Sequence, residues 1–212
     1  LEWDDDFVPD RGKVLSAEQL ENMDQFYRYL DIDGDAIPYR SLPGVHPKGS
    51  YFTRGSGHDK YGRYTEDGAL YQEVVDRLKE KVDSAANSVP EAEIIQNEGV
   101  QIGLVTLGGC RKAVLEAVEK MEADGLYVNY LRVKSFPFGP EVEEFLSSHE
   151  LNIVIEQNRD AQLMKLLIME TDIDKKKLRS VLDNKGSPLS AQTVIDGVQE
   201  LVSQSMATVD GS

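Results

Sequence analysis

Residues from about 100 to 205 alternate apolar runs with amphipathic stretches. Continuous or alternating apolar residues over a short run indicate a strand, and apolar residues spaced three and four apart indicate a helix. We expect strands at 102–107, 126–133, 151–156 and 178–182, and helices at 111–123, from Pro140 onward, at 161–169 and at 193–202. Strands that alternate with helices predict an α/β domain whose parallel sheet is covered by helices on both faces.

Residues 1–66 have a different texture, because they are rich in Gly, Pro, Asp and Tyr and show few periodic apolar stretches. One helix is expected to begin at Ser16, which would form a capping box with Gln19. Its apolar face would continue as far as Leu30. A short strand is expected at 51–53.

A second helix is expected after Thr65, which would act as its cap. This helix carries an apolar stripe at Leu70, Val74, Leu78 and Val82. A segment rich in Ser, Ala and Asn that ends near Pro90 is typical of a linker. We therefore predict three parts, namely a first domain portion at 1–66, a helix and linker at 67–96, and an α/β domain at 97–212.

Composition narrows the function classes. The chain has 212 residues, 40% of them hydrophobic, which indicates a folded protein. Its 38 acidic and 23 basic side chains give a net charge of −15, which argues against nucleic acid and anionic membranes as main partners. No apolar run approaches the roughly 20 residues of a membrane span. A cytoplasmic location is expected, and the first residue, Leu1, suggests that the chain starts within a longer protein.

Candidate chemistry from single motifs is weak. Gly108 and Gly109, between an expected strand and helix, resemble a phosphate cradle, but a tight strand-to-helix turn is the better interpretation. Cys110 is the only cysteine, so the chain has no internal disulfide and cannot ligate an iron–sulfur cluster alone. Asp31, Asp33 and Asp35 lack the spacing of a calcium loop and indicate a solvated acidic turn. The three histidines are scattered, so no metal site is expected.

Arg40 is the best local candidate for ligand binding. It lies between Pro38 and Pro43, in a path that the prolines stiffen. A guanidinium held rigidly can bind a carboxylate through two parallel hydrogen bonds. On the residues alone, a structural or ion-paired arginine remains the alternative.

Several longer stretches resemble a known family. The chain is similar to the alpha subunit of 2-oxoacid:ferredoxin oxidoreductases, above all the 2-oxoglutarate type, and specifically to the C-terminal portion of that subunit. The residues that carry the resemblance are 10–15, 33–44, 51–62, 64–67, 130–138 and 156–163. The resemblance implies that the first part is the C-terminal end of a thiamine-pyrimidine-type domain and that the last part is a transketolase C-terminal-like domain.

The resemblance also implies an activity. The family oxidatively decarboxylates a 2-oxoacid with coenzyme A, giving acyl-CoA, CO2 and reduced ferredoxin. Thiamine diphosphate, Mg²⁺ and an iron–sulfur cluster would lie mainly on a beta subunit, so this chain alone is expected to bind none of them and to be inactive. The implied partners are the beta subunit, ferredoxin, coenzyme A and the 2-oxoacid.

By the same resemblance, Arg40 would bind the carboxylate of the substrate. Asn158, Arg159 and Asp160 would line the coenzyme A path or an interdomain contact, with a plain strand-to-helix cap as the alternative. No residue of the chain is assigned a catalytic role. The chain departs slightly from the family at Asp160-Ala161, where the family often has glycine. A different function class stays open, namely a non-catalytic binding or assembly module with a transketolase C-terminal-like fold.

Overall fold

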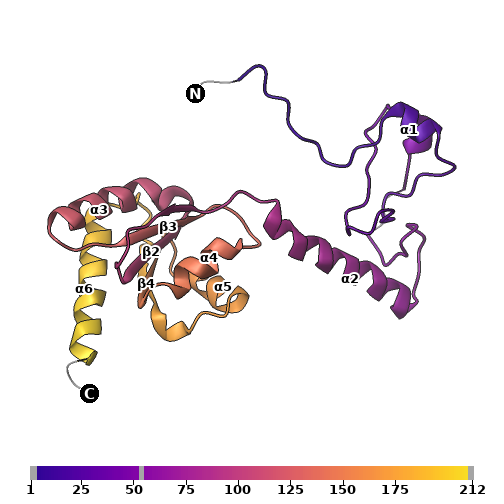
Figure 1. Cartoon of the computed structure of the whole chain (residues 1–212). Coiled ribbons are helices and arrows are strands. Elements are labelled where there is room, and N and C mark those ends of the chain that lie inside the picture. Colours follow the sequence, from indigo (N-terminus) through magenta and orange to yellow (C-terminus); the bar gives the residue numbers. More distant parts are fainter. Residues whose placement is uncertain (1–3, 53–54, 210–212) are drawn as a thin grey trace. The chain divides into compact units, whose positions relative to one another are not determined.

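The computed structural model describes residues 4–52 and 55–209. The chain forms two compact units, Leu1–Ala85 and Ala86–Ser212 (Figure 1). The segment expected as helix and linker, 67–96, is divided between them. It contributes a helix to the first unit and a strand to the second.

The first unit contains a short helix, α1 (Ala17–Glu21), that begins as expected. The Ser16 side chain accepts a hydrogen bond from the backbone N–H of Gln19, and the Gln19 side chain accepts one from the N–H of Ser16. The expected continuation to Leu30 is wrong. The Glu21 carbonyl, which a longer helix would use as an acceptor, instead accepts a hydrogen bond from Lys48 Nζ at 2.6 Å.

The apolar residues after α1 lie in an irregular loop and do not form one face of a helix. Phe26 is buried in a small core with Leu15 and Leu20. Tyr51 packs edge-on against Phe26, with ring centroids 5.9 Å apart, and Tyr51 and Phe52 lie in irregular structure. The strand expected at 51–53 is therefore absent at its first two residues, and Thr53 lies outside the described residues. A 3₁₀ turn, η1 (Pro47–Gly49), precedes this segment.

The long helix of the first unit is α2 (Gly68–Ser84). Asp67, not Thr65, caps it, because the Asp67 carboxylate accepts hydrogen bonds from the N–H groups of Ala69 and Leu70 at 2.8 and 3.3 Å. An anion is also favoured at a helix N-terminus. Of the expected apolar stripe only Val74 is buried, and the other members are exposed in this unit. The turn η2 (Ala85–Asn87) follows α2.

The second unit is built on a five-stranded sheet with the order β1-β3-β2-β4-β5. Four strands are parallel, as expected: β2 (Ile102–Leu107), β3 (Asn129–Val133), β4 (Leu151–Glu156) and β5 (Leu178–Leu182). The strand expected from residue 126 begins only at Asn129. The edge strand β1 (Glu93–Ile95) was not expected and runs antiparallel to β3.

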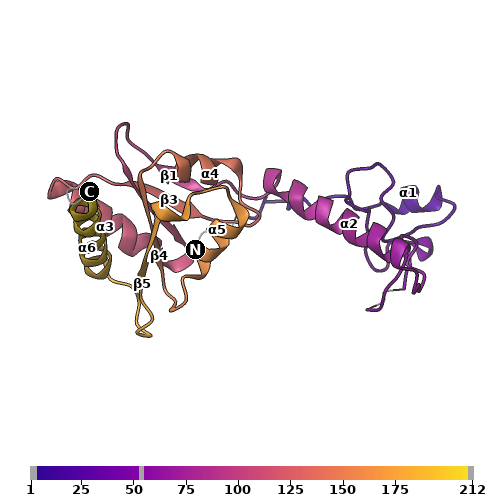
Figure 2. The ribbon, with the colours of Figure 1, turned by 90° about the horizontal axis from the view of Figure 1, so that it is seen from below.

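Helices cover both faces of this sheet (Figures 1 and 2), which confirms the predicted α/β fold. On one face, α3 (Arg111–Ala123) and α6 (Ala191–Val209) pack over Leu104 and Ile153. On the other, α4 (Pro140–Ser147) and α5 (Gln162–Glu170) pack over Val105 and Val154. The remaining elements are the 3₁₀ turns η3 (Gly108–Cys110) and η4 (Lys175–Lys177). No helix in the described ranges is long and apolar enough to cross a membrane.

Candidate functional site

The main chain around Arg40 is fixed by pairing with an earlier segment of the first unit. Arg40 and Val14 form an isolated parallel bridge. The Arg40 N–H donates to the Lys13 carbonyl and the Leu15 N–H donates to the Arg40 carbonyl, both at 2.9 Å. Both backbone polar groups of Arg40 are therefore satisfied, and the residue is held in one extended conformation.

The loop that follows Arg40 is closed tightly. Ser41 is buried, and its hydroxyl donates to the Gly49 carbonyl at 2.5 Å. A Cβ on Gly49 would lie 2.9 Å from Ser41 Cβ, so only glycine allows this approach. Lys48 and His46 tie the same loop to α1, because Lys48 Nζ bonds the Glu21 carbonyl and His46 Nε2 lies 2.8 Å from a Glu21 carboxylate oxygen.

The Arg40 guanidinium is half-buried and oriented through one of its nitrogens. Nη2 donates to the main-chain oxygen of Arg11. Among the residues that the structure describes, Arg40 has no carboxylate partner. Since a guanidinium carries five N–H donors, most of its hydrogen-bonding capacity remains for a ligand. The surface ion pair considered as the alternative is not seen for this arginine within the described ranges.

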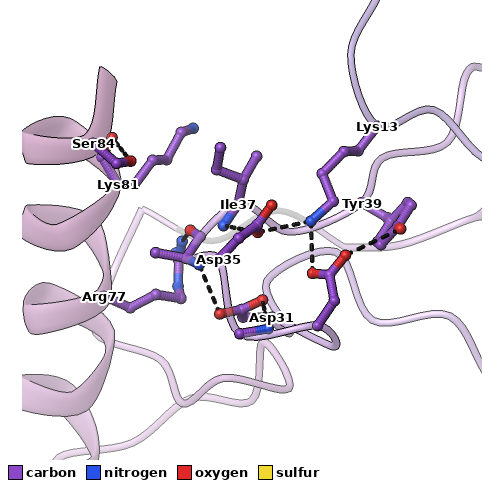
Figure 3. Close-up of polar contacts among 11 residues, drawn as sticks. Lys13, Asp31, Asp35, Ile37, Tyr39, Arg77, Lys81 and Ser84 are labelled. Atoms are coloured by element: carbon purple, nitrogen blue, oxygen red, sulfur yellow. Dashed lines mark hydrogen bonds and ion pairs between the residues drawn. The ribbon is translucent and has the colours of Figure 1, made fainter. Parts of the chain in front are cut away.

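A cluster of acidic residues lies in the same unit (Figure 3). Oxygen atoms of Asp31, Asp33 and Asp35 lie within 4.8 Å of one another. Lys13 Nζ bonds Asp33 and Asp35 at 2.6 and 2.7 Å, so an ammonium group occupies the position where a cation would be attracted. Tyr39 donates its hydroxyl to Asp33 at 3.1 Å.

These contacts shift the pKa values of Asp33, Lys13 and Tyr39. The hydrogen bond from Lys13, above all, lowers the pKa of Asp33. Partial desolvation acts to lower the pKa of Lys13, but its hydrogen bonds to Asp33 and Asp35 raise it on balance. The hydrogen bond to Asp33 raises the pKa of Tyr39. The Lys13 ammonium thus offsets part of the negative charge of the acidic turn and bonds two of its three carboxylates.

The second unit has a groove of about 850 Å³ at the carboxyl ends of its parallel strands. The chain crosses from β2 to β3 on one side and then to β4 on the other, so the strand order reverses here. Open α/β sheets bind ligands at such a point. The polar residues lining the groove are Gly108, Gly109, Arg132, Lys134, Ser135, Glu156, Gln157, Asn158 and Gln162.

The three residues expected near this edge have different surroundings. Asn158 lines the groove, donates to Glu156 Oε1 at 2.9 Å, and accepts from the Asp160 N–H at 3.0 Å. Arg159 and Asp160 are exposed and pair with each other at 2.8 Å. The local geometry contains the strand-to-helix cap that was the alternative, since Asn158 Oδ1 also lies 3.4 Å from the Gln162 N–H.

Glu156 is a groove residue that sequence reasoning missed. It is only 2% exposed, and its carboxylate accepts hydrogen bonds from the N–H groups of Leu163 and Met164 at 2.6 and 3.3 Å. These hydrogen bonds place the Glu156 carboxyl group at the N-terminus of α5, where the first N–H groups of the helix need acceptors. A signal was available, since an acidic residue ends the mostly apolar strand expected at 151–156, a few residues before the helix expected at 161–169.

A second missed cluster lies beside the groove. Arg111 of α3 binds Glu93 of β1 through three hydrogen bonds from Nε and Nη2, and Arg132 Nη1 lies 3.6 Å from the same carboxylate. The hydrogen bond from Arg111 lowers the pKa of Glu93 to about 2. Burial raises the pKa of Tyr130 to about 12. Because β1 was not expected from the sequence, neither was this ion pair.

The surroundings of the remaining candidates, Cys110 and the Gly108–Gly109 turn, fit a structural role. Cys110 is buried at the start of α3, and its Sγ lies 4.0 Å from Gln157 Oε1. Gly108 has φ +60, which a strand-to-helix turn favours in glycine. The Gly108–Gly109 turn therefore fits the interpretation preferred above, although it also forms part of the groove wall.

Comparisons with known proteins agree with the resemblance. The chain is 28% identical over 203 residues to 2-oxoacid:ferredoxin oxidoreductase 2, subunit alpha, from Aeropyrum pernix, which covers 93% of this chain and 31% of that protein. It is 23% identical over 199 residues to the corresponding alpha subunit from Saccharolobus solfataricus, covering 91% and 30%. The chain therefore spans about a third of the length of these relatives. No protein-family model matches it.

A solved structure shares the fold. The 2-oxoglutarate:ferredoxin oxidoreductase from Magnetococcus marinus aligns with a TM-score of 0.73 over 84% of this chain and 31% of that one, at 23% identity. Together with the two relatives, this likeness extends across both units. Over most of its length, the curated homologues of this chain are alpha subunits of 2-oxoacid:ferredoxin oxidoreductases.

Proposed function

We propose that this chain is part of the alpha subunit of a cytoplasmic enzyme complex that oxidatively decarboxylates a 2-oxoacid. The 2-oxoacid and coenzyme A would be converted to acyl-CoA and CO2, and the electrons released would reduce ferredoxin. A beta subunit would be the partner in the complex. Support comes from homology across more than nine tenths of the chain.

The observation that carries the proposal is the Arg40 guanidinium. The main chain of Arg40 is hydrogen-bonded on both sides. One guanidinium nitrogen donates to the Arg11 carbonyl, and no described carboxylate neutralises the guanidinium. A 2-oxoacid presents a planar carboxylate, which matches the fork of an arginine. In this proposal Arg40 binds and orients the substrate carboxylate and performs no proton transfer.

Two observations bear on the metal ion and the iron–sulfur cluster that such a reaction needs. Within the described ranges, the one grouping of acidic residues with the spacing of metal ligands holds the Lys13 ammonium, and one buried cysteine cannot hold an iron–sulfur cluster. We therefore assign thiamine diphosphate, Mg²⁺ and the cluster mainly to the beta subunit.

Coenzyme A is assigned to the groove of the second unit. Arg132 and Lys134 supply positive charge to its wall, and Asn158 supplies an amide. A volume of about 850 Å³ lies in the range of pockets that hold small ligands, roughly 300–1,000 Å³. Arg159 and Asp160, which pair with each other at the surface, are proposed for the rim of that path or for an interdomain contact.

The substrate to test first is 2-oxoglutarate. The sequence resembles the 2-oxoglutarate type, and the solved structure with this fold contains 2-oxoglutarate, coenzyme A and succinyl-CoA. Arg40 would bind the carboxylate that every 2-oxoacid carries, so it does not by itself select the side chain.

Reconstitution tests the proposal. The full-length parent of this chain is co-expressed with its beta subunit, and viologen reduction is followed with 2-oxoglutarate or pyruvate, with and without coenzyme A. We expect reduction that requires the 2-oxoacid, coenzyme A and both subunits, and none from the 212-residue chain alone. A stable assembly that reduces no acceptor with any 2-oxoacid would favour the non-catalytic assembly module instead.

A further inference from the structure

A small basic cavity lies in the first unit, separate from Arg40. It has a volume of about 290 Å³. The residues that line it are Arg28, Tyr29, Pro38, Tyr51, Arg77, Leu78 and Lys81. Three of them are cations and none is acidic, in a chain where acidic residues outnumber basic ones by 38 to 23. We call the space that these residues line the Arg28–Arg77–Lys81 cavity.

The cations converge from two elements. Arg77 and Lys81 occupy successive turns of α2, and both leave the helix on the side of the loop that carries Asp31 and Ile37 (Figure 3). Arg77 Nη1 donates to the Ala36 carbonyl at 2.9 Å, which fixes its guanidinium. Arg28 comes from the segment after α1 and lies near enough to Arg77 to act on its charge.

No carboxylate among the described residues lines the cavity to balance its positive charge. Neither Arg28 nor Lys81 forms an ion pair with a described carboxylate. Asp31 is the nearby acid, but its two oxygens accept from the N–H groups of Gly34 and Ala36, and it does not line the cavity. Like charges held together without a counterion repel each other, and a bound anion would relieve this repulsion.

The walls are rigid and aromatic. Tyr29 stacks on His58 with ring centroids 4.2 Å apart, and Tyr51 packs against Phe26 at 5.9 Å. Pro38 is buried. Packed residues thus form part of the cavity wall, and exposed side chains, namely Tyr51, Leu78 and Lys81, form another part.

From this geometry we infer that the Arg28–Arg77–Lys81 cavity binds a phosphate-class oxyanion, either inorganic phosphate or the phosphate of a small monoester. Arginine forks and a lysine ammonium are the groups that proteins use for phosphate oxygens. About 290 Å³ is below the usual range for a whole nucleotide but accommodates one phosphate group. The inference does not depend on the proposed redox function.

Titration calorimetry on the 212-residue chain at constant ionic strength tests this inference. The probes are inorganic phosphate, glycerol 3-phosphate and acetate. We expect both phosphates to bind and acetate to bind more weakly, with the tighter of the two phosphates indicating the source. Undetectable binding of both phosphates, or tighter binding of acetate, would overturn the inference.

Variants locate the binding. Lys81→Gln and Arg28→Gln should each weaken phosphate binding by about tenfold or more, because each removes a charge-assisted contact. Lys79→Gln is the matched control, since Lys79 lies on the same helix, is paired with Asp83 and does not line the cavity. Circular dichroism checks folding, and the exposed position of Lys81 makes Lys81→Gln the decisive variant. An equal loss in Lys79→Gln and Lys81→Gln would contradict the assignment.

Discussion

Arg111 Nε lies 2.8 Å from Glu93 Oε2, while Arg111 Nη2 binds Oε1 of the same carboxylate. This two-pronged ion pair joins the first helix after the central strand to the antiparallel edge strand β1. It positions Glu93 beside Arg132, a residue of the groove wall. The edge strand is therefore tied to the groove by side chains as well as by its ladder with β3.

The Glu93 ion pair predicts a pH dependence of stability. The pKa of Glu93 is lowered from its ordinary value of 4.5 to about 2 in the folded protein. A carboxylate with a depressed folded-state pKa stabilises the fold above its unfolded-state pKa, and this stabilisation is lost as the pH falls from about 4.5 toward 2. Urea unfolding of wild type and Glu93→Gln should therefore differ most near neutral pH and converge at low pH. A difference that grows on acidification would contradict this assignment.

The division between the units predicts which fragment folds. Residues 86–212 contain the whole sheet with both helical layers, and we expect this fragment to unfold cooperatively. A fragment of 97–212 lacks β1, which leaves Arg111 and Arg132 without Glu93, and should have a lower Tm. Calorimetry of both fragments is the measurement. Equal Tm values would show that β1 adds nothing to stability, and an insoluble 86–212 product would overturn the division.

Ala161 predicts a stabilising substitution. It precedes α5 with φ 50 and ψ 52, in the left-handed region that strains a residue with a Cβ. Ala161→Gly should raise the free energy of unfolding by up to about 1 kcal/mol. The matched control is Ala117→Gly, which is also buried but lies in the interior of the right-handed helix α3 and should lose at least about 0.5–1 kcal/mol. Urea midpoints measure both, and a destabilised Ala161→Gly would show that the lost methyl contacts outweigh the relieved strain.

Local patterns in the sequence predicted the second unit well. Apolar runs such as 102–107 and 151–156 are buried on both faces, so their hydrophobicity alone indicates parallel strands. The Ser16–Gln19 capping box was also predictable, because its partners are three residues apart. The strand β1 was missed because its Ile94 and Ile95 are exposed at the sheet edge, and three residues make no clear period.

The failures arose from contacts between residues far apart in sequence. α1 ends at Glu21, whose carbonyl accepts a hydrogen bond from Lys48, 27 residues further along the chain. Lys13 donates a hydrogen bond to Asp33, 20 residues further along the chain, and no local sequence pattern predicts this contact. Arg40 was singled out by its flanking prolines, but its anchor on the Arg11 carbonyl, 29 residues distant, is visible only in the fold.

The role of Arg40 is tested most directly in the intact complex, by steady-state kinetics of Arg40→Lys. Lysine keeps the charge but loses the fork that pairs with a planar carboxylate. Losing one charge-assisted contact is worth roughly 1.5–3 kcal/mol. We therefore expect kcat/KM for the 2-oxoacid to fall by about ten- to a hundredfold, while the apparent affinity for coenzyme A stays unchanged.

The matched control is Arg179→Lys, because Arg179 also donates to main-chain carbonyls but lies on β5, outside the groove lining. It should retain wild-type kinetics. The account predicts a selective loss of kcat/KM for the 2-oxoacid in Arg40→Lys alone. Equal kcat/KM in wild type and Arg40→Lys, with both complexes folded and assembled, would contradict it.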